Sequence, residues 1–280
     1  MNQARSMSLP SGEKIAALGQ GTWHFAENPA RRADEVASIR LGIDLGMTVI
    51  DTAEMYGNGA AETLVGEAIA GRRSEVFLVD KVLPHHANRV GTVRACEASL
   101  VRLGVDHIDL YLLHWPGPIP SVETIEGFAE LKLRGMIRHW GVSNFDIDDM
   151  IELSSVPGGD EVQANQILYN LTRRGPEYAL LPWLAQHRIT AMAYSPIEQG
   201  RLLEHPALEP IALQHNATPA QIALAWVLQH DGVNAIPRAG TPSHVRQNAA
   251  ALDIELTRDE LHALDRAFPP PDGPRPLEVL

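Results

Sequence analysis

Short apolar runs, each ending at a polar or aromatic residue, recur roughly every 30 residues, the length of one strand with its following helix. The spacing predicts eight strand–helix units along the chain. The interval before the last run is longer than the others and predicts an extended connection there. The runs end at Trp23, Asp51, Lys81, His114, Ser143, Gln166, Tyr194 and Arg238.

The segments between these runs carry the spacing of helices. Val93, Cys96 and Leu100 fall on one helical face. Residues 222–228 are apolar nearly all round, which predicts a deeply packed helix. In the first half of the chain a glycine closes each helical segment, because glycine adopts the left-handed conformation without a steric penalty. These glycines are Gly46, Gly71, Gly104 and Gly135.

Continuous apolar strands that alternate with helices indicate a parallel sheet covered on both faces. Eight such units predict an α/β fold closed as a (β/α)8 TIM barrel, a single domain over residues 1–280. A doubly wound sheet would need a glycine-rich dinucleotide fingerprint. The nearest match, residues 57–62, has glutamate in place of the third glycine and predicts a loop and helix start. Residues 1–14 are interpreted as a lead-in, and the proline-rich tail 268–280 should cross one barrel end or extend into solvent.

Composition narrows the functional classes. The 280 residues include 23 Lys and Arg against 35 Asp and Glu, a net charge of −12, which disfavours nucleic acid or an anionic membrane as a partner. The single cysteine excludes a disulfide framework, and the histidines lack zinc-ligand spacing. No signal peptide or membrane-spanning run is evident. We expect a cytoplasmic monomer, without a metal, that acts on a small molecule.

Four residues with complementary chemistry are expected at one end of the barrel. Asp51, Lys81 and His114 end successive strands, and Tyr56 follows shortly after the first; reacting groups of barrel enzymes lie at the C-terminal strand ends. A buried lysine needs a charge partner, and Asp51 is the natural one. The ammonium would lower the pKa of Tyr56, so that the phenol could donate a proton while His114 orients a carbonyl oxygen. The alternative is a structural ion pair beside a packed tyrosine and histidine.

An ordered set of segments carries a family resemblance. The segments are 51–57, Lys81, 112–115, 140–144, Gln166, 193–196 and 236–238. Together they resemble the aldo-keto reductases over essentially the whole chain, and most closely the bacterial, short-loop members that reduce methylglyoxal and related small aldehydes. The resemblance implies NADPH-dependent reduction of aldehydes or ketones to alcohols by hydride transfer. It places the family's catalytic tetrad on Asp51, Tyr56, Lys81 and His114, with the tyrosine as general acid.

The resemblance also implies a cofactor site across the barrel mouth. Ser143, Asn144 and Gln166 would hydrogen-bond the nicotinamide carboxamide, and Tyr194 would stack on the nicotinamide ring. Each of these has a structural alternative: a helix cap for the first two, a satisfied core amide for the glutamine and a packed ring for the tyrosine. The same match adds Ser195, Pro196, Ile236 and Pro237 to the cofactor-binding set.

The eighth unit matches the family's adenosine-phosphate segment. Arg238 stands where many relatives have lysine, and its guanidinium can hold a 2′-phosphate with two hydrogen bonds. His244 stands where relatives have a basic residue, often arginine, and carries its charge less reliably at pH 7. The expected cofactor is therefore NADP(H), and NAD(H) stays open. Gln247 and Asn248 would contact the adenine amino group.

Fewer residues define the substrate side. Trp23 and Trp115 follow strand ends and would wall the pocket, with Met55 as a third candidate.

Two other functions stay open. A desolvated Lys81 could form a Schiff base, as in aldolases, although pairing with Asp51 would keep it protonated. The second alternative function is a sensor, in which the barrel binds NADP(H) with little turnover.

Overall fold

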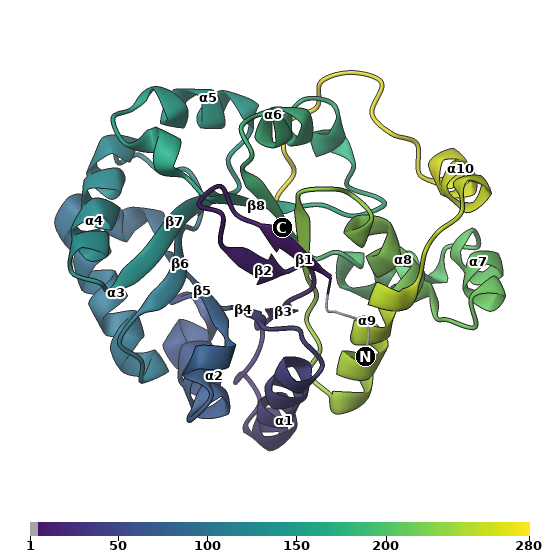
Figure 1. The fold of residues 1–280 in the computed structure, drawn as a ribbon, viewed down its shortest axis with the longest axis horizontal. Helices are drawn as coiled ribbons and strands as arrows, with labels where there is room; N and C mark the ends of the chain where they lie inside the picture. Colours follow the sequence, from purple (N-terminus) through teal and green to yellow (C-terminus); the bar gives the residue numbers. More distant parts are fainter. Residues whose placement is uncertain (1–4) are drawn as a thin grey trace.

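The computed structural model describes residues 5–280, which form a ring of helices around a barrel of parallel strands (Figure 1). The strands follow sequence order, each hydrogen-bonded in parallel to the next. Bridges from Leu18 to Ala235 and from Gly21 to Arg238 join the first strand to the last, so the predicted (β/α)8 barrel is confirmed. The strands are β3 (Gln20–Gly21), β4 (Val49–Asp51), β5 (Phe77–Val82), β6 (Ile108–Leu113), β7 (Ile137–Ser143), β8 (Ala164–Leu168), β9 (Thr190–Tyr194) and β10 (Val233–Ile236).

The helices on the outside follow the predicted pattern. Residues 222–228 are all buried, and the four glycines predicted to close helices have φ between 65° and 86°. No helix in residues 5–280 is long and apolar enough to cross a membrane. The helices are α1 (Arg32–Asp44), α2 (Ala60–Ile69), α3 (Arg89–Leu103), α4 (Ser121–Leu133), α5 (Ile147–Ser155), α6 (Leu180–Gln186), α7 (Leu208–Gln214), α8 (Pro219–Leu228), α9 (Pro242–Ala250) and α10 (Arg258–Ala267).

Several strand ends differ from the prediction. Strand β8 continues past Gln166 to Leu168, because the buried glutamine is a polar residue within the strand rather than its end. Strands β3 and β10 stop two residues early, so Trp23 and Arg238 lie in the loops that follow them. A pattern of apolar runs marks a polar residue as a boundary whether its side chain enters a loop or the barrel.

An antiparallel hairpin closes the N-terminal end of the barrel. It consists of β1 (Ser6–Ser8) and β2 (Lys14–Ala16), so it begins in the segment interpreted as a lead-in and extends two residues beyond it; residues 1–4 lie outside the described residues. Leu9 and Ile15 pack against the inward side chains at the strand starts, such as Val49. Figure 1 shows the hairpin lying across the barrel. Only the C-terminal end of the barrel is therefore open for a site.

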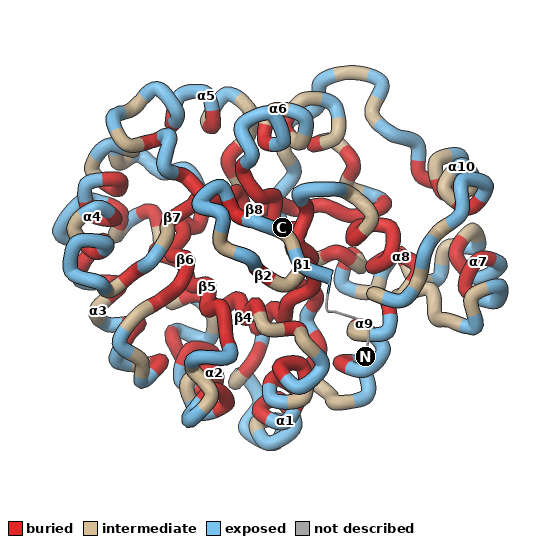
Figure 2. The backbone as a smooth tube through the Cα atoms, in the orientation of Figure 1, coloured by how far each residue is buried: buried red, intermediate tan, exposed pale blue. Residues whose placement is uncertain are grey.

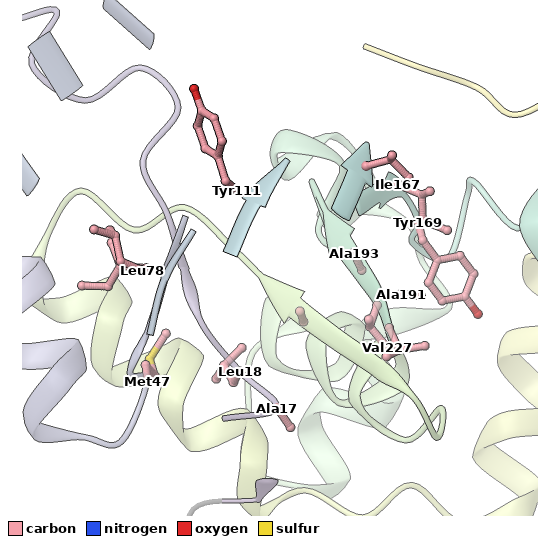
Figure 3. Close-up of a cluster of buried hydrophobic side chains, with 14 of the residues drawn as sticks. Ala17, Leu18, Met47, Leu78, Tyr111, Ile167, Tyr169, Ala191, Ala193 and Val227 are labelled. Atoms are coloured by element: carbon pink, nitrogen blue, oxygen red, sulfur yellow. The ribbon is translucent and has the colours of Figure 1, made fainter. Parts of the chain in front are cut away.

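Buried side chains form two layers. The inner layer fills the barrel under the hairpin, and the outer layer lies between strands and helices. Figure 2 shows the strands as the buried centre and the outward helix faces as exposed. Figure 3 shows part of the outer layer, in which Leu78, Tyr111 and Ile167 extend from three different strands. The two layers hold the strands rigidly, and the strand ends carry the candidate site.

The proline-rich tail crosses the open end of the barrel, one of the two outcomes expected for it. After α10 the chain returns over the barrel (Figure 1). The Leu277 N–H donates to Asp146 Oδ2 at 2.8 Å, and Glu278 forms an ion pair with Arg173. Leu280 then reaches the cavity at the mouth. The tail is thus part of the wall of the site.

The close approach of α2 and α3 depends on Gly66. A Cβ on this residue would lie 2.2 Å from the Leu103 carbonyl oxygen. We expect Gly66→Ala to lower the free energy of unfolding by about 1–3 kcal/mol, because the backbone of α3 must move. The matched control is Gly273→Ala, where no heavy atom lies within 4 Å. Urea unfolding followed by circular dichroism measures both variants, and equal stability of the two would contradict this account.

Candidate active site

Lys81 lies at the centre of the site, near the end of β5, with its side chain fully buried. Its Nζ donates hydrogen bonds to the Asp51 carboxylate at 2.8 Å, to the Thr52 carbonyl oxygen at 2.8 Å and to Tyr56 Oη at 3.2 Å. An ammonium has three protons, and these bonds use all of them. The geometry therefore fixes a positive charge against the tyrosine hydroxyl.

Burial and neighbouring charges act in opposite directions on this pair. Burial lowers the pKa of Lys81, but Asp51 and Tyr56 raise it, and the net shift is upward. Burial raises the pKa of Tyr56, and the Lys81 ammonium offsets only part of that rise. The sequence predicts a lowered tyrosine pKa; in the structure burial outweighs the ammonium, so that prediction is wrong in sign. The phenol is consequently protonated at neutral pH, the form that a proton donor needs.

His114 follows β6 on another side of the tyrosine. The rings of Tyr56 and His114 meet edge to face with centroids 5.9 Å apart. Burial, and then the charge of Lys81, lower the pKa of His114 to about 2, so the imidazole is neutral. Its Nδ1 is buried and has no hydrogen-bond partner in the described part of the chain. A neutral imidazole has one donor and one acceptor, so the ring can orient a carbonyl oxygen without supplying charge.

A hydrogen-bond network connects the tetrad to the next strands around the barrel. Gln166 Nε2 donates to Asp51 Oδ1 at 2.7 Å, and Ser143 Oγ donates to the Gln166 carbonyl oxygen at 2.9 Å. Asn144 Nδ2 donates to Ser143 Oγ at 3.2 Å, and Tyr194 Oη donates to Asn144 Oδ1 at 2.9 Å. The structure thus brings together the four residues that the resemblance assigns to the carboxamide and the nicotinamide ring.

The structure also tests the structural alternatives for these residues. Asp146, not Ser143 or Asn144, caps α5 and forms its capping box. Asn144 has φ of 59°, a left-handed conformation that is uncommon outside glycine, although asparagine adopts it more readily than most residues. Backbone strain of this kind concentrates at functional sites, where the surrounding structure holds it in place. A capping role therefore does not explain these two side chains.

A cavity of about 400 Å³ opens at the C-terminal end of the barrel. Tyr56, His114 and Asp51 contribute to its wall, whereas Lys81 lies behind them. The other predicted residues that line it are Trp23, Met55, Trp115, Ser143, Asn144, Gln166, Tyr194, Ser195, Pro196, Ile236 and Arg238. Those that do not line it are Pro237, His244, Gln247 and Asn248.

The last three of these residues lie on α9, the helix that follows the loop with Arg238. His244 and Gln247 are exposed on the helix, and Asn248 is buried. The helix begins four residues after Arg238, at Pro242. In residues 5–280, no group of three or more His, Cys, Asp or Glu side chains could hold a metal ion.

Sequence reasoning missed several wall residues. They are Gly21, His24, Ile197, Gln199, Gly200 and Leu280. Gln199 and Gly200 both have positive φ, in a loop whose sequence has no chemical motif. Leu280 reaches the wall only because the tail folds back over the mouth. A signal in the tail was available, since its prolines exclude a helix and leave crossing the barrel as one of two options.

Comparisons with known proteins agree with this geometry. The model of the aldo/keto reductase family matches residues 17–268. The methylglyoxal reductase YeaE of Escherichia coli K12 is 49% identical, over 99% of this chain and 100% of that enzyme. An aldo-keto reductase of Mycobacterium avium is 36% identical, over 97% and 92% of the two chains. A crystal structure of an aldo/keto reductase from Klebsiella pneumoniae, in complex with NADP and acetate, is 48% identical with a TM-score of 0.97, over 99% and 100% of the chains. This chain therefore belongs to the aldo/keto reductase family.

Proposed function

We propose that this protein reduces small aldehydes and ketones, methylglyoxal among them, to alcohols with NADPH as the hydride source. The observation that carries the proposal is the buried Lys81 ammonium, held by Asp51 at 2.8 Å and directed at the Tyr56 hydroxyl at 3.2 Å. It places a proton donor in the wall of an open cavity. The methylglyoxal reductase activity named for the Escherichia coli relative and the NADP bound in the Klebsiella pneumoniae structure support the substrate class and the cofactor.

The residues at the mouth fit a nicotinamide dinucleotide. Ser195 Oγ is buried without a hydrogen-bond partner in residues 5–280, and Arg238 has no carboxylate within ion-pair distance there. Polar groups in these states are typical of a site completed by a ligand. Ser143, Asn144 and Gln166 would hold the nicotinamide end, with Tyr194 against its ring. The remaining predicted residues would hold the rest, namely Ser195, Pro196, Ile236, Pro237, Arg238, His244, Gln247 and Asn248.

The bound cofactor supplies the hydride. Tyr56 Oη gives its proton to the oxygen of the reduced carbonyl, and Lys81 stabilises the phenolate that this leaves. Asp51 positions the ammonium and is itself held by Gln166. His114, neutral and buried, orients the substrate oxygen toward the tyrosine. The rings of Trp23 and Trp115, with Met55, shape the substrate end of the cavity.

The Schiff-base alternative is weaker than the reductase proposal. A lysine nucleophile needs a free amine that a substrate can reach. Lys81 is fully buried, donates three hydrogen bonds and has a raised pKa because Asp51 and Tyr56 outweigh the effect of burial. The sensor alternative differs from the reductase only in turnover, because both bind NADP(H).

The first test is a turnover assay on the purified protein. We expect methylglyoxal to be reduced with NADPH, and with NADH more slowly, because Arg238 supplies a charge for the 2′-phosphate. The consumption of each cofactor is followed by absorbance over substrates from methylglyoxal to bulky aromatic aldehydes. Tight NADPH binding with negligible turnover over the whole panel would favour the sensor, and borohydride trapping of a ketone on Lys81 would favour the aldolase.

The second test removes one oxygen atom. Tyr56→Phe should lower kcat by about 10²–10⁴-fold, because the proton donor is lost, while NADPH affinity stays nearly unchanged. Stopped-flow turnover and NADPH fluorescence measure the two quantities. The matched control is Tyr178→Phe, at an exposed tyrosine that does not line the cavity and should keep full activity. Near-full turnover of the Tyr56 variant would refute the assigned proton donor.

The third test is the pH profile of kcat/KM for reduction. The pKa of His114 lies at about 2, so its ring is already neutral well below the ordinary histidine value of about 6.5, and no inflection is expected there. The Tyr56 proton is present below a pKa that burial raises, so activity should fall only as pH rises beyond about 10. An inflection at about pH 6.5 that disappears in His114→Asn would contradict the assignment of a neutral imidazole.

A further inference from the structure

Two arginines from opposite ends of the sequence converge at one edge of the barrel mouth. Arg31 ends a short 3-10 turn (Pro29–Arg31) before α1, and Arg238 follows β10. A Cβ placed on Gly240 would lie 3.0 Å from Arg31 Nη2 and 3.8 Å from Arg238 Nη2. Helices α1 and α9 pack side by side there (Figure 1). Both guanidiniums therefore face the same small space over Gly240.

This arrangement places two positive charges together without an ion-pair partner in the described residues. Neither arginine has a carboxylate within ion-pair distance among residues 5–280. Arg238 lies over the Phe25 ring, with its guanidinium carbon 5.4 Å from the ring centroid. Burial and the nearby charge of Arg31 lower the pKa of Arg238, and the more distant carboxylates of Glu35 and Glu27 offset only part of that shift. Two adjacent guanidiniums repel each other, so an anion bound between them would remove an unfavourable interaction as well as add favourable ones.

The surroundings of the pair suit a phosphate group. Gly240 has no side chain, which lets the Arg31 guanidinium come close to the backbone beside Arg238. Helix α9, nine residues long, begins two positions later, and its N-cap residue Thr241 makes no side-chain capping hydrogen bond. The first backbone N–H groups of a helix favour anions, and a guanidinium can hold a phosphate with two parallel hydrogen bonds. A phosphate monoester at this place would meet donors from both sides.

We propose that Arg31 is the second arm of the phosphate site and determines, together with Arg238, the preference for a 2′-phosphorylated adenine dinucleotide. The inference rests on the proposed function and deepens it, because it assigns cofactor choice to a residue outside the segment that resembles the family's adenosine-phosphate site. Arg31 binds the 2′-phosphate from one side and Arg238 from the other. A dinucleotide without that phosphate leaves the two guanidiniums facing each other.

The test is equilibrium binding, which does not depend on turnover. Isothermal titration calorimetry measures the Kd of adenosine 2′,5′-bisphosphate and of adenosine 5′-monophosphate, which differ only in the 2′-phosphate. Arg31→Gln should weaken the bisphosphate by about tenfold or more, the loss expected for a charge-assisted hydrogen bond, and leave the monophosphate unchanged. The Kd of NADPH and NADH, from the change in tryptophan fluorescence, should follow the same pattern.

The matched control is Arg32→Gln, at the next residue. Arg32 forms an ion pair with Glu67 at 2.5 Å, on α2, and should not affect either nucleotide. The double variant of Arg31 and Arg238 should lose less bisphosphate affinity than the two single losses multiplied, because both residues bind one group. Thermal unfolding of each variant without nucleotide checks that the barrel is intact.

The outcomes separate this inference from the proposed function. If Arg31→Gln leaves the bisphosphate Kd unchanged, or weakens both nucleotides equally, the second arm is refuted even when the enzyme reduces methylglyoxal. If the wild-type protein binds the bisphosphate through Arg31 but shows no turnover, the reductase proposal fails and the phosphate site stands. Loss of bisphosphate affinity in the Arg32 control to the same extent would also overturn the inference.

Discussion

The site depends on a single buried ion pair. Removing an ammonium from water costs several kcal/mol, and the protein offsets that cost only by surrounding Lys81 with acceptors. Asp51, the Thr52 carbonyl and Tyr56 accept hydrogen bonds from its three protons. Gln166 in turn donates a hydrogen bond to Oδ1 of the Asp51 carboxylate. Since these groups come from β4, β5, β8 and the loop after β4, the charge can be buried only when the barrel is closed.

The barrel explains why this chemistry lies at one end only. Parallel strands carry their C-terminal ends to the same side, and the β1–β2 hairpin fills the other side with Leu9 and Ile15. The remaining opening is bounded by the loops after the strands and by the tail at Leu280. Water is excluded from Lys81 but not from Tyr56. The tyrosine hydroxyl therefore faces the cavity, whereas the lysine ammonium beside it has no contact with solvent.

The sequence predicted what local patterns can report. Apolar runs located all eight strands, and glycines such as Gly104 marked helix ends because the left-handed conformation is a local property of the backbone. The four tetrad residues were found because each lies at or just after a strand end. Local patterns could not predict that Gln166 lies inside its strand. Whether a polar residue ends a strand or points into the barrel depends on a partner distant in the sequence, which is Asp51 here.

Other features depend on contacts that no local pattern contains. The sign of the Tyr56 pKa shift follows from burial outweighing the ammonium, a balance that requires the packed structure. The convergence of Arg31 and Arg238 joins the loop after the first barrel strand to the loop after the last, neighbours only because the barrel closes. The hairpin and the path of the tail are long-range in the same sense.

Lys81 and the pair of Arg31 and Arg238 differ in whether a carboxylate of the protein balances their positive charge. The Lys81 ammonium is matched by a carboxylate and has no free proton to donate, so it acts on a ligand only through the hydroxyl of Tyr56. The guanidiniums of Arg31 and Arg238 have no carboxylate within ion-pair distance in residues 5–280, and burial and then the charge of Arg31 lower the pKa of Arg238. A charge satisfied within the fold tunes a neighbouring group, whereas a charge left unsatisfied gains its partner from outside. On the proposals made above, the chain thus keeps the charge that assists proton transfer apart from the charges that select the cofactor.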